Sequence, residues 1–387
     1  MKFLTKLFAA MLAVVTVFAF SACNGNKDND KNNQFGWALE VESETVKAEK
    51  EGEQDKKVLT VKGFFVAQGT LNEIASGIAK NIELKIGEGK FNVYDEATGT
   101  YDTEDDYAKY DEVIIDKDVF VNQQIIGSVV ITDKVTEIGE GAFGGCPNIT
   151  KMTIPFVGTK KADVYNVQKT FAVLFGTNEV TGCTSMTVNY NSSGSGTYSL
   201  PSGLTEVIVK YSEKAELPAY AFAGITVLKN VTLNNVTEIG NSAFAGCSAL
   251  TNVTVNSAAD VTAIGSSAFA NCTSLYGIDL AAFTNANLVV YNEAFSGCTK
   301  LGATYDELVL PNATFMEKTF SGCTSIKAVD LTDAKFIGDY CFKNCTGLKK
   351  VKGNAQATGT GAFLGCTLDE NESRSVDDYG NLVVKVI

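Results

Sequence analysis

The sequence contains no histidine at all. Histidine is the usual general base, the usual partner of a nucleophilic serine or cysteine, and the commonest zinc ligand. Its absence excludes the most frequent kinds of hydrolytic and zinc-dependent site. An enzyme built from this chain would have to rely on carboxylates, lysine, tyrosine or cysteine.

Basic residues are also in short supply. The chain has 32 Lys and Arg against 45 Asp and Glu, which gives a net charge of −13. Such an excess of negative charge argues against nucleic acid and against an anionic membrane surface as partners. The chain is nevertheless 45% hydrophobic and only 20% charged, so it can bury a core. Its 387 residues are compatible with one to three domains.

Residues 1–22 have the composition of a signal peptide. Two lysines precede an apolar run from Leu7 to Phe20, which is short for a membrane span. The following Ser-Ala-Cys23 resembles a bacterial lipoprotein signal, although Phe20 stands where leucine is usual. That resemblance implies that Cys23 is lipidated and anchors the protein to a membrane. The alternative is an ordinary secretory signal with a chance cysteine.

Residues 23–36 are polar and show no hydrophobic period, so we expect a flexible tether. Within it, Lys27-Asp28-Asn29-Asp30 resembles the short charged export signals of surface lipoproteins from Gram-negative anaerobes. The resemblance implies a lipid-anchored protein at the outer membrane or cell surface of a Gram-negative bacterium.

An internal repeat dominates the rest of the chain, with a phenylalanine and a cysteine three positions apart. From Cys247 onward the cysteines recur every 21 to 26 residues. An Ile-Gly pair often precedes the phenylalanine, and a strand-like Leu-x-x-hydrophobic-x-hydrophobic stretch follows the cysteine. The clear copies are Phe143 and Cys146, Phe244 and Cys247, Phe269 and Cys272, Phe295 and Cys298, Phe320 and Cys323, Phe342 and Cys345, and Phe363 and Cys366.

A unit this short cannot bury its apolar side alone, but stacked copies can. We expect each turn to supply one short strand, a bend at the glycine, and a short helical or 3₁₀ turn with the phenylalanine and cysteine. Two degenerate copies place Gln123 and Ile225 in the cysteine position. Because Ile225 can replace the cysteine, the position indicates packing rather than chemistry.

The whole pattern resembles the BspA-like leucine-rich repeat family, over roughly residues 113–368. The resemblance implies an α/β fold: a right-handed, curved leucine-rich-repeat solenoid of short strands and short helical turns. It also implies a bacterial surface lipoprotein that adheres to or binds host proteins, with no catalytic residues. We assign residues 113–387 to these repeats, with an irregular stretch at 155–200.

Residues 37–112 are expected to close the open end of the solenoid as a small β-α-β cap. Its parts are a strand from Val58 to Phe65, a capped amphipathic helix from Thr70 to Lys80, and a strand from Ile82 to Ile86. The final residues 382–387 would cap the other end.

The stretch 95–112 carries eight carboxylates and is predicted to be a solvated acidic insertion. Calcium binding is the alternative, although the regular spacing of a calcium loop with its central glycine is missing. Among the ten cysteines, free thiols are favoured over disulfides, with Cys341 and Cys345 as the conceivable exception. We expect no metal site and no cofactor.

Alternation along the strands predicts which side chains point outward and could hold a ligand. The partner would be a surface protein of a host or neighbouring cell, or a glycan, bound without catalysis by a monomer. The alternatives are a carboxylate-based glycan-processing enzyme and a purely structural envelope protein. The candidate ligand-binding residues are Thr153, Asn230, Thr232, Asn252, Thr254, Asp279, Glu307 and Asp330.

Overall fold

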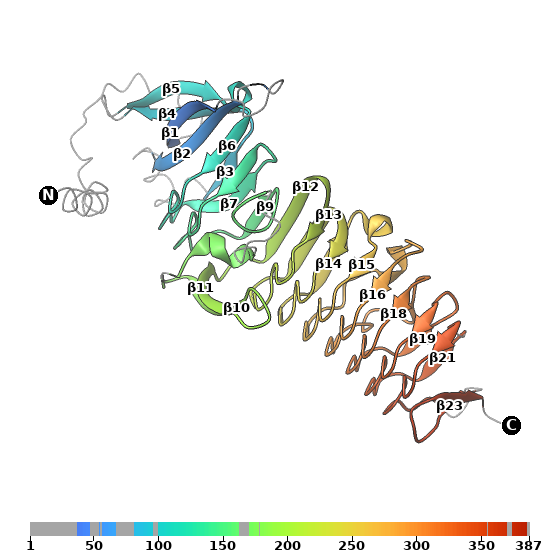
Figure 1. The fold of residues 1–387 in the computed structure, drawn as a ribbon. Helices are drawn as coiled ribbons and strands as arrows, with labels where there is room; N and C mark the ends of the chain where they lie inside the picture. Colours follow the sequence, from blue (N-terminus) through green and yellow to red (C-terminus); the bar gives the residue numbers. More distant parts are fainter. Residues whose placement is uncertain are drawn as a thin grey trace.

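The computed structural model describes residues 37–46, 54, 56–66, 81–95, 100–161, 170–177, 179–353, 355–369 and 374–384. They form a parallel-strand β-solenoid of about 10 turns. The molecule is elongated and runs from the hairpin of β4 (Lys90–Asp95) and β5 (Thr100–Asp106) at one end to β23 (Arg374–Val376) at the other (Figure 1). The candidate lipidation site, the tether and the expected helix from Thr70 to Lys80 lie outside the described residues.

The N-terminal end is a six-stranded sheet with the order β5-β4-β1-β2-β6-β8. The acidic stretch is not a loop insertion, because most of it builds the hairpin β4–β5 and strand β6 of this sheet. The carboxylate of Glu112 forms an ion pair with Lys56. The carboxylate of Asp111 accepts a hydrogen bond from the backbone N–H of Lys57. The strands are β1 (Trp37–Val46), β2 (Lys56–Val66), β4 (Lys90–Asp95), β5 (Thr100–Asp106), β6 (Glu112–Ile115) and β8 (Val135–Ile138).

The two strands of the expected β-α-β cap do form, but they belong to different sheets. Strand β2 lies in the six-stranded sheet, whereas β3 (Ile82–Ile86) pairs in parallel with β7 (Ile126–Ile131). β7 in turn pairs with β9 (Lys151–Ile154). The parallel stack therefore begins at β3, well before residue 113, because its alternating apolar residues Leu84 and Ile86 are buried in the common core.

Most regular turns contribute two strands rather than the expected one, whereas the turn of Phe269 and Cys272 has only β16 (Val289–Val290) and an isolated bridge at Gly277. The first ladder runs through β3, β7 and β9, the starts of β12 and β13, and β14. It resumes at β17, β19 and β21. Apart from β3 and β12, its strands follow the Phe–Cys turns or their degenerate copies. The second ladder lies where the Ile-Gly pair or its replacement stands in each turn. It includes the ends of β12 and β13 and then β15, β16, β18, β20 and β22. The further strands are β12 (Glu206–Leu217), β13 (Asn230–Ile239), β14 (Asn252–Val255), β15 (Ala263–Ile264), β16 (Val289–Val290), β17 (Leu308–Val309), β18 (Thr314–Phe315), β19 (Ala328–Asp330), β20 (Phe336–Ile337), β21 (Lys350–Lys352) and β22 (Ala357–Thr358).

The glycine of the Ile-Gly pair is explained by close approach of successive turns. A Cβ atom on Gly265 would lie 2.6 Å from the backbone nitrogen of Asn241 in the preceding turn, and one on Gly240 would lie 2.5 Å from that of Ala219. No side chain fits at such a distance. In these two turns the close approach is possible because the position lacks a Cβ. Tyr291 and Met316 hold the equivalent position in the next two turns, where each still donates its N–H to the preceding turn.

The Phe–Cys segments are hydrogen-bonded turns and not helices. In the turn at Phe244, the residues before the alanine and before the cysteine, Ser242 and Gly246, have φ values of 53° and 74°. A right-handed helix cannot pass through two left-handed residues, so the chain turns a corner instead. Helical structure in the described residues is limited to four 3₁₀ segments: Tyr107–Lys109, Phe171–Phe175, Ala258–Asp260 and Leu280–Ala282.

The predicted phenylalanine stack is confirmed. All seven repeat phenylalanines are fully buried, and the rings of Phe244, Phe269 and Phe295 stack with centroids 5.0 Å apart. The same column continues from Phe295 to Phe320, Phe342 and Phe363 at separations of 5.1 to 5.6 Å. This column is one edge of a continuous core that runs the length of the solenoid.

In the irregular stretch at 155–200, a 3₁₀ segment takes the place of a regular turn and keeps the core continuous. The 3₁₀ segment Phe171–Phe175 lies between the turns of Phe143 and Phe222, because Phe143 donates its N–H to Leu174 and Phe171 donates its own to Ala221. After it, β10 (Cys183–Asn189) and β11 (Ser195–Pro201) form an antiparallel hairpin. A second hairpin of β23 (Arg374–Val376) and β24 (Leu382–Val384) lies at the C-terminal end.

Candidate ligand-binding face

The candidate residues lie mostly on the outward face of the first ladder, where register aligns them in two rows. Pairing of β9, β12, β13 and β14 puts equivalent residues of successive turns side by side. The first row contains Lys151, Glu206, Asn230 and Asn252. The second row contains Thr153, Ile208, Thr232 and Thr254.

The middle of these rows is uncharged. Asn252 donates from its amide nitrogen to the Thr254 hydroxyl over 3.1 Å, which orients both side chains at the surface. The two preceding strands of the ladder, β9 and β12, carry charged residues in the first row. The ammonium nitrogen of Lys151 lies 2.7 Å from a carboxylate oxygen of Glu206, and this ion pair is open to solvent. The centre of the face therefore offers amide and hydroxyl groups, both donors and acceptors.

Asp279 extends the second row by one turn. A parallel bridge joins Asn252 to Gly277, so Asp279 follows Thr254. Its carboxylate accepts a hydrogen bond from the N–H of Ala281 and caps the short 3₁₀ segment Leu280–Ala282. Burial, together with the nearby negative charge of Asp279, raises the pKa of Tyr305. Asp279 is exposed and remains open to a ligand on its solvent side.

The C-terminal part of the face is charged, and here one candidate residue is not free. Asp330 is only 8% exposed, and its carboxylate lies 2.7 Å from the Nζ of Lys352. The same ammonium group lies 3.7 Å from Glu307. Burial by itself would raise the pKa of Asp330, but hydrogen bonds from Lys352 and Thr332 hold it below its usual value. Asp330 therefore ties neighbouring turns together and is not a free contact residue.

The arrangement of Glu307 and Asp330 bears on the enzymatic alternative. A glycosidase needs one carboxyl group that stays protonated to act as general acid. Here a single lysine lies against both groups, and the pKa of Asp330 is lowered rather than raised. The pair is therefore suited to an ion-pair network and not to acid–base catalysis.

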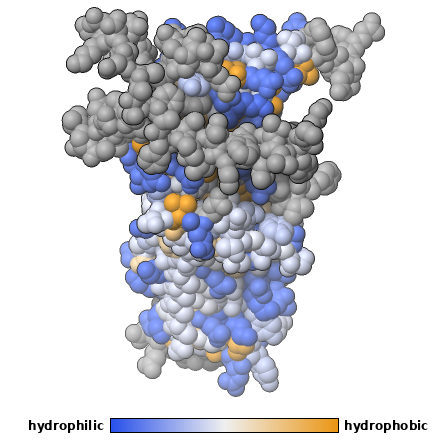
Figure 2. All heavy atoms as spheres, turned by 90° about the vertical axis from the view of Figure 1, so that its left-hand side faces the viewer, coloured by the Kyte–Doolittle hydropathy of each residue, from blue (hydrophilic) through white to orange (hydrophobic). Residues whose placement is uncertain are grey.

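One exposed aromatic side chain beside the rows was missed by sequence reasoning. Tyr276, immediately before Gly277, is 39% exposed. The outward position of Val309, which is 40% exposed, follows from alternation along its strand. A tyrosine at the start of a strand in an otherwise Thr- and Lys-rich column was the available signal. On the side of the molecule shown in Figure 2, hydrophobic residues form only small, separate spots among the described residues. The composition of the two rows favours recognition by polar contacts, with Tyr276 and Val309 as apolar additions.

The cysteines form a second column inside the core and take no part in the outward face. All nine described cysteines are free thiols, and every one except Cys183 is buried. Burial raises the pKa of the Cys247 thiol to about 12, so it stays protonated at neutral pH. Among the described residues, no cluster of three or more acidic or thiol side chains has the geometry of a metal site.

Comparison with known proteins shows the family. The sequence model of the BspA type leucine-rich repeat region matches residues 113–169, 192–305 and 282–377, in six copies. These ranges cover more than half of the chain, and the protein belongs to this family. No curated protein matches the sequence.

Solved structures of bacterial leucine-rich repeat proteins are similar to the chain. A leucine-rich repeat protein of T. pallidum is 26% identical, with a TM-score of 0.36, over 43% of this chain and 78% of its own. A leucine-rich cell-surface protein of Faecalibacterium prausnitzii is 17% identical, with a TM-score of 0.29, over 79% of this chain and 94% of its own. A leucine-rich repeat protein from Bacteroides ovatus is 17% identical, with a TM-score of 0.25, over 84% and 91%.

Proposed function

We propose that this protein is a cell-surface binding protein that holds an extended ligand on the outward face of its first ladder, without turnover. The ligand would be a surface protein of a host or neighbouring cell, or a glycan. The observation that carries the proposal is the register of β9, β12, β13 and β14, which repeats the same polar positions over consecutive turns. A periodic ligand can meet such a periodic face at several turns at once.

Binding to this face would rest on many hydrogen bonds, each with a small net contribution. A net contribution of about 1 kcal/mol per hydrogen bond is typical, so affinity would come from the number of turns engaged. Asn230, Thr232, Asn252 and Thr254 form the uncharged centre, and Asp279 and Glu307 lie toward its acidic end. Membership of the BspA type repeat family supports a binding role.

Arginine substitutions on the face test the proposal. Asn252→Arg and Asp279→Arg place a bulky charge in the two rows, and each should weaken binding of the full chain to solubilised host matrix or to a glycan array at least ten-fold. Ala357→Arg is the matched control, because Ala357 is an exposed position of the second ladder. Equal loss with the control, or hydrolysis of the ligand, would contradict the proposal. Absence of binding to every ligand would favour the purely structural role.

We further propose that Cys23 carries the lipid anchor, at the outer membrane or cell surface of a Gram-negative bacterium. The proposal rests on Ser21-Ala22-Cys23 after the apolar run. No helix in the described part of the chain is long and apolar enough to cross a membrane. Mass spectrometry of the mature N-terminus should find an acylated Cys23, and Cys23→Ser should release or misprocess the protein. An unlipidated mature chain that retains its N-terminal apolar segment would refute the anchor.

A further inference from the structure

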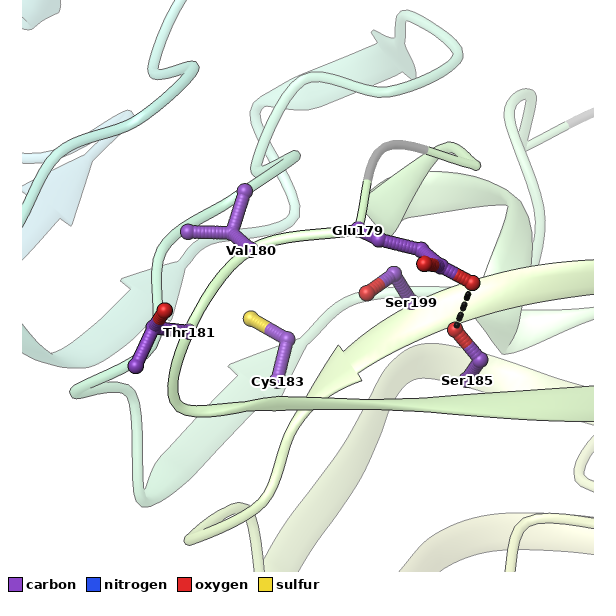
Figure 3. Close-up of a pocket in the computed structure, with 6 residues that line it drawn as sticks. All are labelled: Glu179, Val180, Thr181, Cys183, Ser185 and Ser199. Carbon is purple, nitrogen blue, oxygen red and sulfur yellow. Dashed lines mark hydrogen bonds between the residues drawn. The ribbon is translucent and has the colours of Figure 1, made fainter.

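A pocket of about 410 Å³ lies between the β10–β11 hairpin and the loop that precedes it, away from the two rows of the first ladder (Figure 3). The pocket is open to solvent rather than enclosed, so a ligand in it would be covered on one side only. Ser185 and Ser199 are direct cross-strand partners on the hairpin, and Glu179 lies across from them on the loop. The lining residues are Glu179, Val180, Thr181, Cys183, Ser185 and Ser199.

Ser199 is the unusual member of this pocket. Ser199 is only 1% exposed, and its hydroxyl has no hydrogen-bond partner among the described residues. Figure 3 shows the hydroxyl oxygen turned into the space between Glu179 and Cys183. A buried hydroxyl without a partner costs free energy, so such groups in native structures usually meet a water or a ligand.

Glu179 supplies the complementary half of the site. Its carboxylate accepts one hydrogen bond of 3.3 Å, from Ser185, and retains acceptor capacity for others. The six lining residues include no lysine or arginine that would neutralise it. The pocket therefore presents one O–H that needs an acceptor and one carboxylate that can take a further donor.

We propose that this pocket binds a neutral hydroxylated ligand, a single sugar residue or a comparable polyol. A ligand hydroxyl can accept a hydrogen bond from the O–H of Ser199 and at the same time donate one to the carboxylate of Glu179, so both groups gain a partner. An ammonium group cannot accept from Ser199, and an anionic ligand is repelled by Glu179. The hydroxyls of Thr181 and Ser185 would serve neighbouring groups of the same ring. This site is separate from the face proposed above, so either proposal can fail alone.

Cys183 supplies a built-in reporter. It lines the pocket and is the one described cysteine that is not buried. In the full chain, the rate of its alkylation by iodoacetamide, followed by peptide mass spectrometry, should fall saturably when glucose or galactose is added. The matched anions glucuronate and galacturonate should protect Cys183 at least ten-fold less well.

Two variants and a control separate binding from fold. Ser199→Ala and Glu179→Gln should each weaken protection by the sugar at least ten-fold, with unchanged thermal unfolding. Thr187→Ala, on an exposed position of the same hairpin, should leave protection unchanged. The proposal is overturned if neither neutral sugar protects Cys183, if the uronates protect equally well, or if both variants retain full protection.

Discussion

The thiol of Cys272 donates a hydrogen bond to the carbonyl oxygen of Phe244, 3.1 Å away and one turn earlier in the chain. The same carbonyl also accepts from the N–H of Cys247 at 3.0 Å, so it has two donors. The relationship recurs in all seven clear copies of the repeat. The remaining pairs are Cys146 with Phe120, Cys247 with Phe222, Cys298 with Phe269, Cys323 with Phe295, Cys345 with Phe320, and Cys366 with Phe342.

Removal of one thiol should therefore cost more than its small volume suggests. Cys272→Ala deletes a buried sulfur and one donor, and we expect a loss of roughly 1–3 kcal/mol in the free energy of unfolding. Urea titration monitored by circular dichroism measures it. Thr273→Ala changes an exposed neighbour and should stay within about 0.5 kcal/mol of wild type. An equally small effect of Cys272→Ala would mean that the thiol bond is without consequence.

The phenylalanine column predicts a larger effect. Phe269 is fully buried between Phe244 and Phe295, so Phe269→Ala removes two ring contacts and opens a cavity. The expected cost is about 3–5 kcal/mol, measured by urea titration. Tyr276→Ala removes a large but partly exposed ring in the same turn and should cost far less. If the two variants unfold alike, the column is not a main source of stability.

Backbone conformation predicts opposite outcomes for two positions of one turn. Gly297 has a φ of 74°, and a Cβ there would lie 2.5 Å from the Asn271 side-chain oxygen. Gly297→Ala should therefore lower the unfolding midpoint. Glu293 has a φ of 59°, so Glu293→Gly relieves strain and should leave the midpoint unchanged or raised. Thermal unfolding of both variants measures the two midpoints. A Gly297→Ala midpoint above that of Glu293→Gly would contradict the prediction.

The ion pair of Asp330 and Lys352 predicts acid sensitivity. The pKa of Asp330 is lowered in the folded protein, so its contribution is full above the unfolded value near 4 and disappears as pH falls through the lower folded value. Asp330→Asn should be less stable than wild type at pH 7, and the gap should shrink toward pH 2. Urea midpoints at both values measure it. If the difference in urea midpoint between wild type and Asp330→Asn is the same at both pH values, the ion pair is not the cause of that difference.

Several features could be predicted from the sequence because they depend on local periodicity. Phe244, Phe269 and Phe295 recur at a fixed offset from a cysteine and a leucine, and only stacked turns can bury such a set. Alternation within each strand likewise placed Asn252 and Thr254 outward and Val253 inward. These properties follow from the order of residues within one unit.

Other features required the turns to be placed against each other. The two-residue strands of the second ladder, such as Ala263–Ile264, are too short for any periodic signal and exist through pairing with the next turn. The thiol of Cys272 and the carbonyl of Phe244 are 28 residues apart in sequence.

Long-range contacts also decide the state of the candidate site. Asp330 resembles Asp279 in its strand position, yet the ammonium of Lys352 from the following turn covers one and not the other. The unpartnered hydroxyl of Ser199 is likewise buried by a loop that comes many residues earlier. The sequence alone determined the repeat, its core and its outward positions, because these are periodic. Tertiary structure alone decided which of those polar groups are left free for a ligand, because that depends on neighbours that no local pattern specifies.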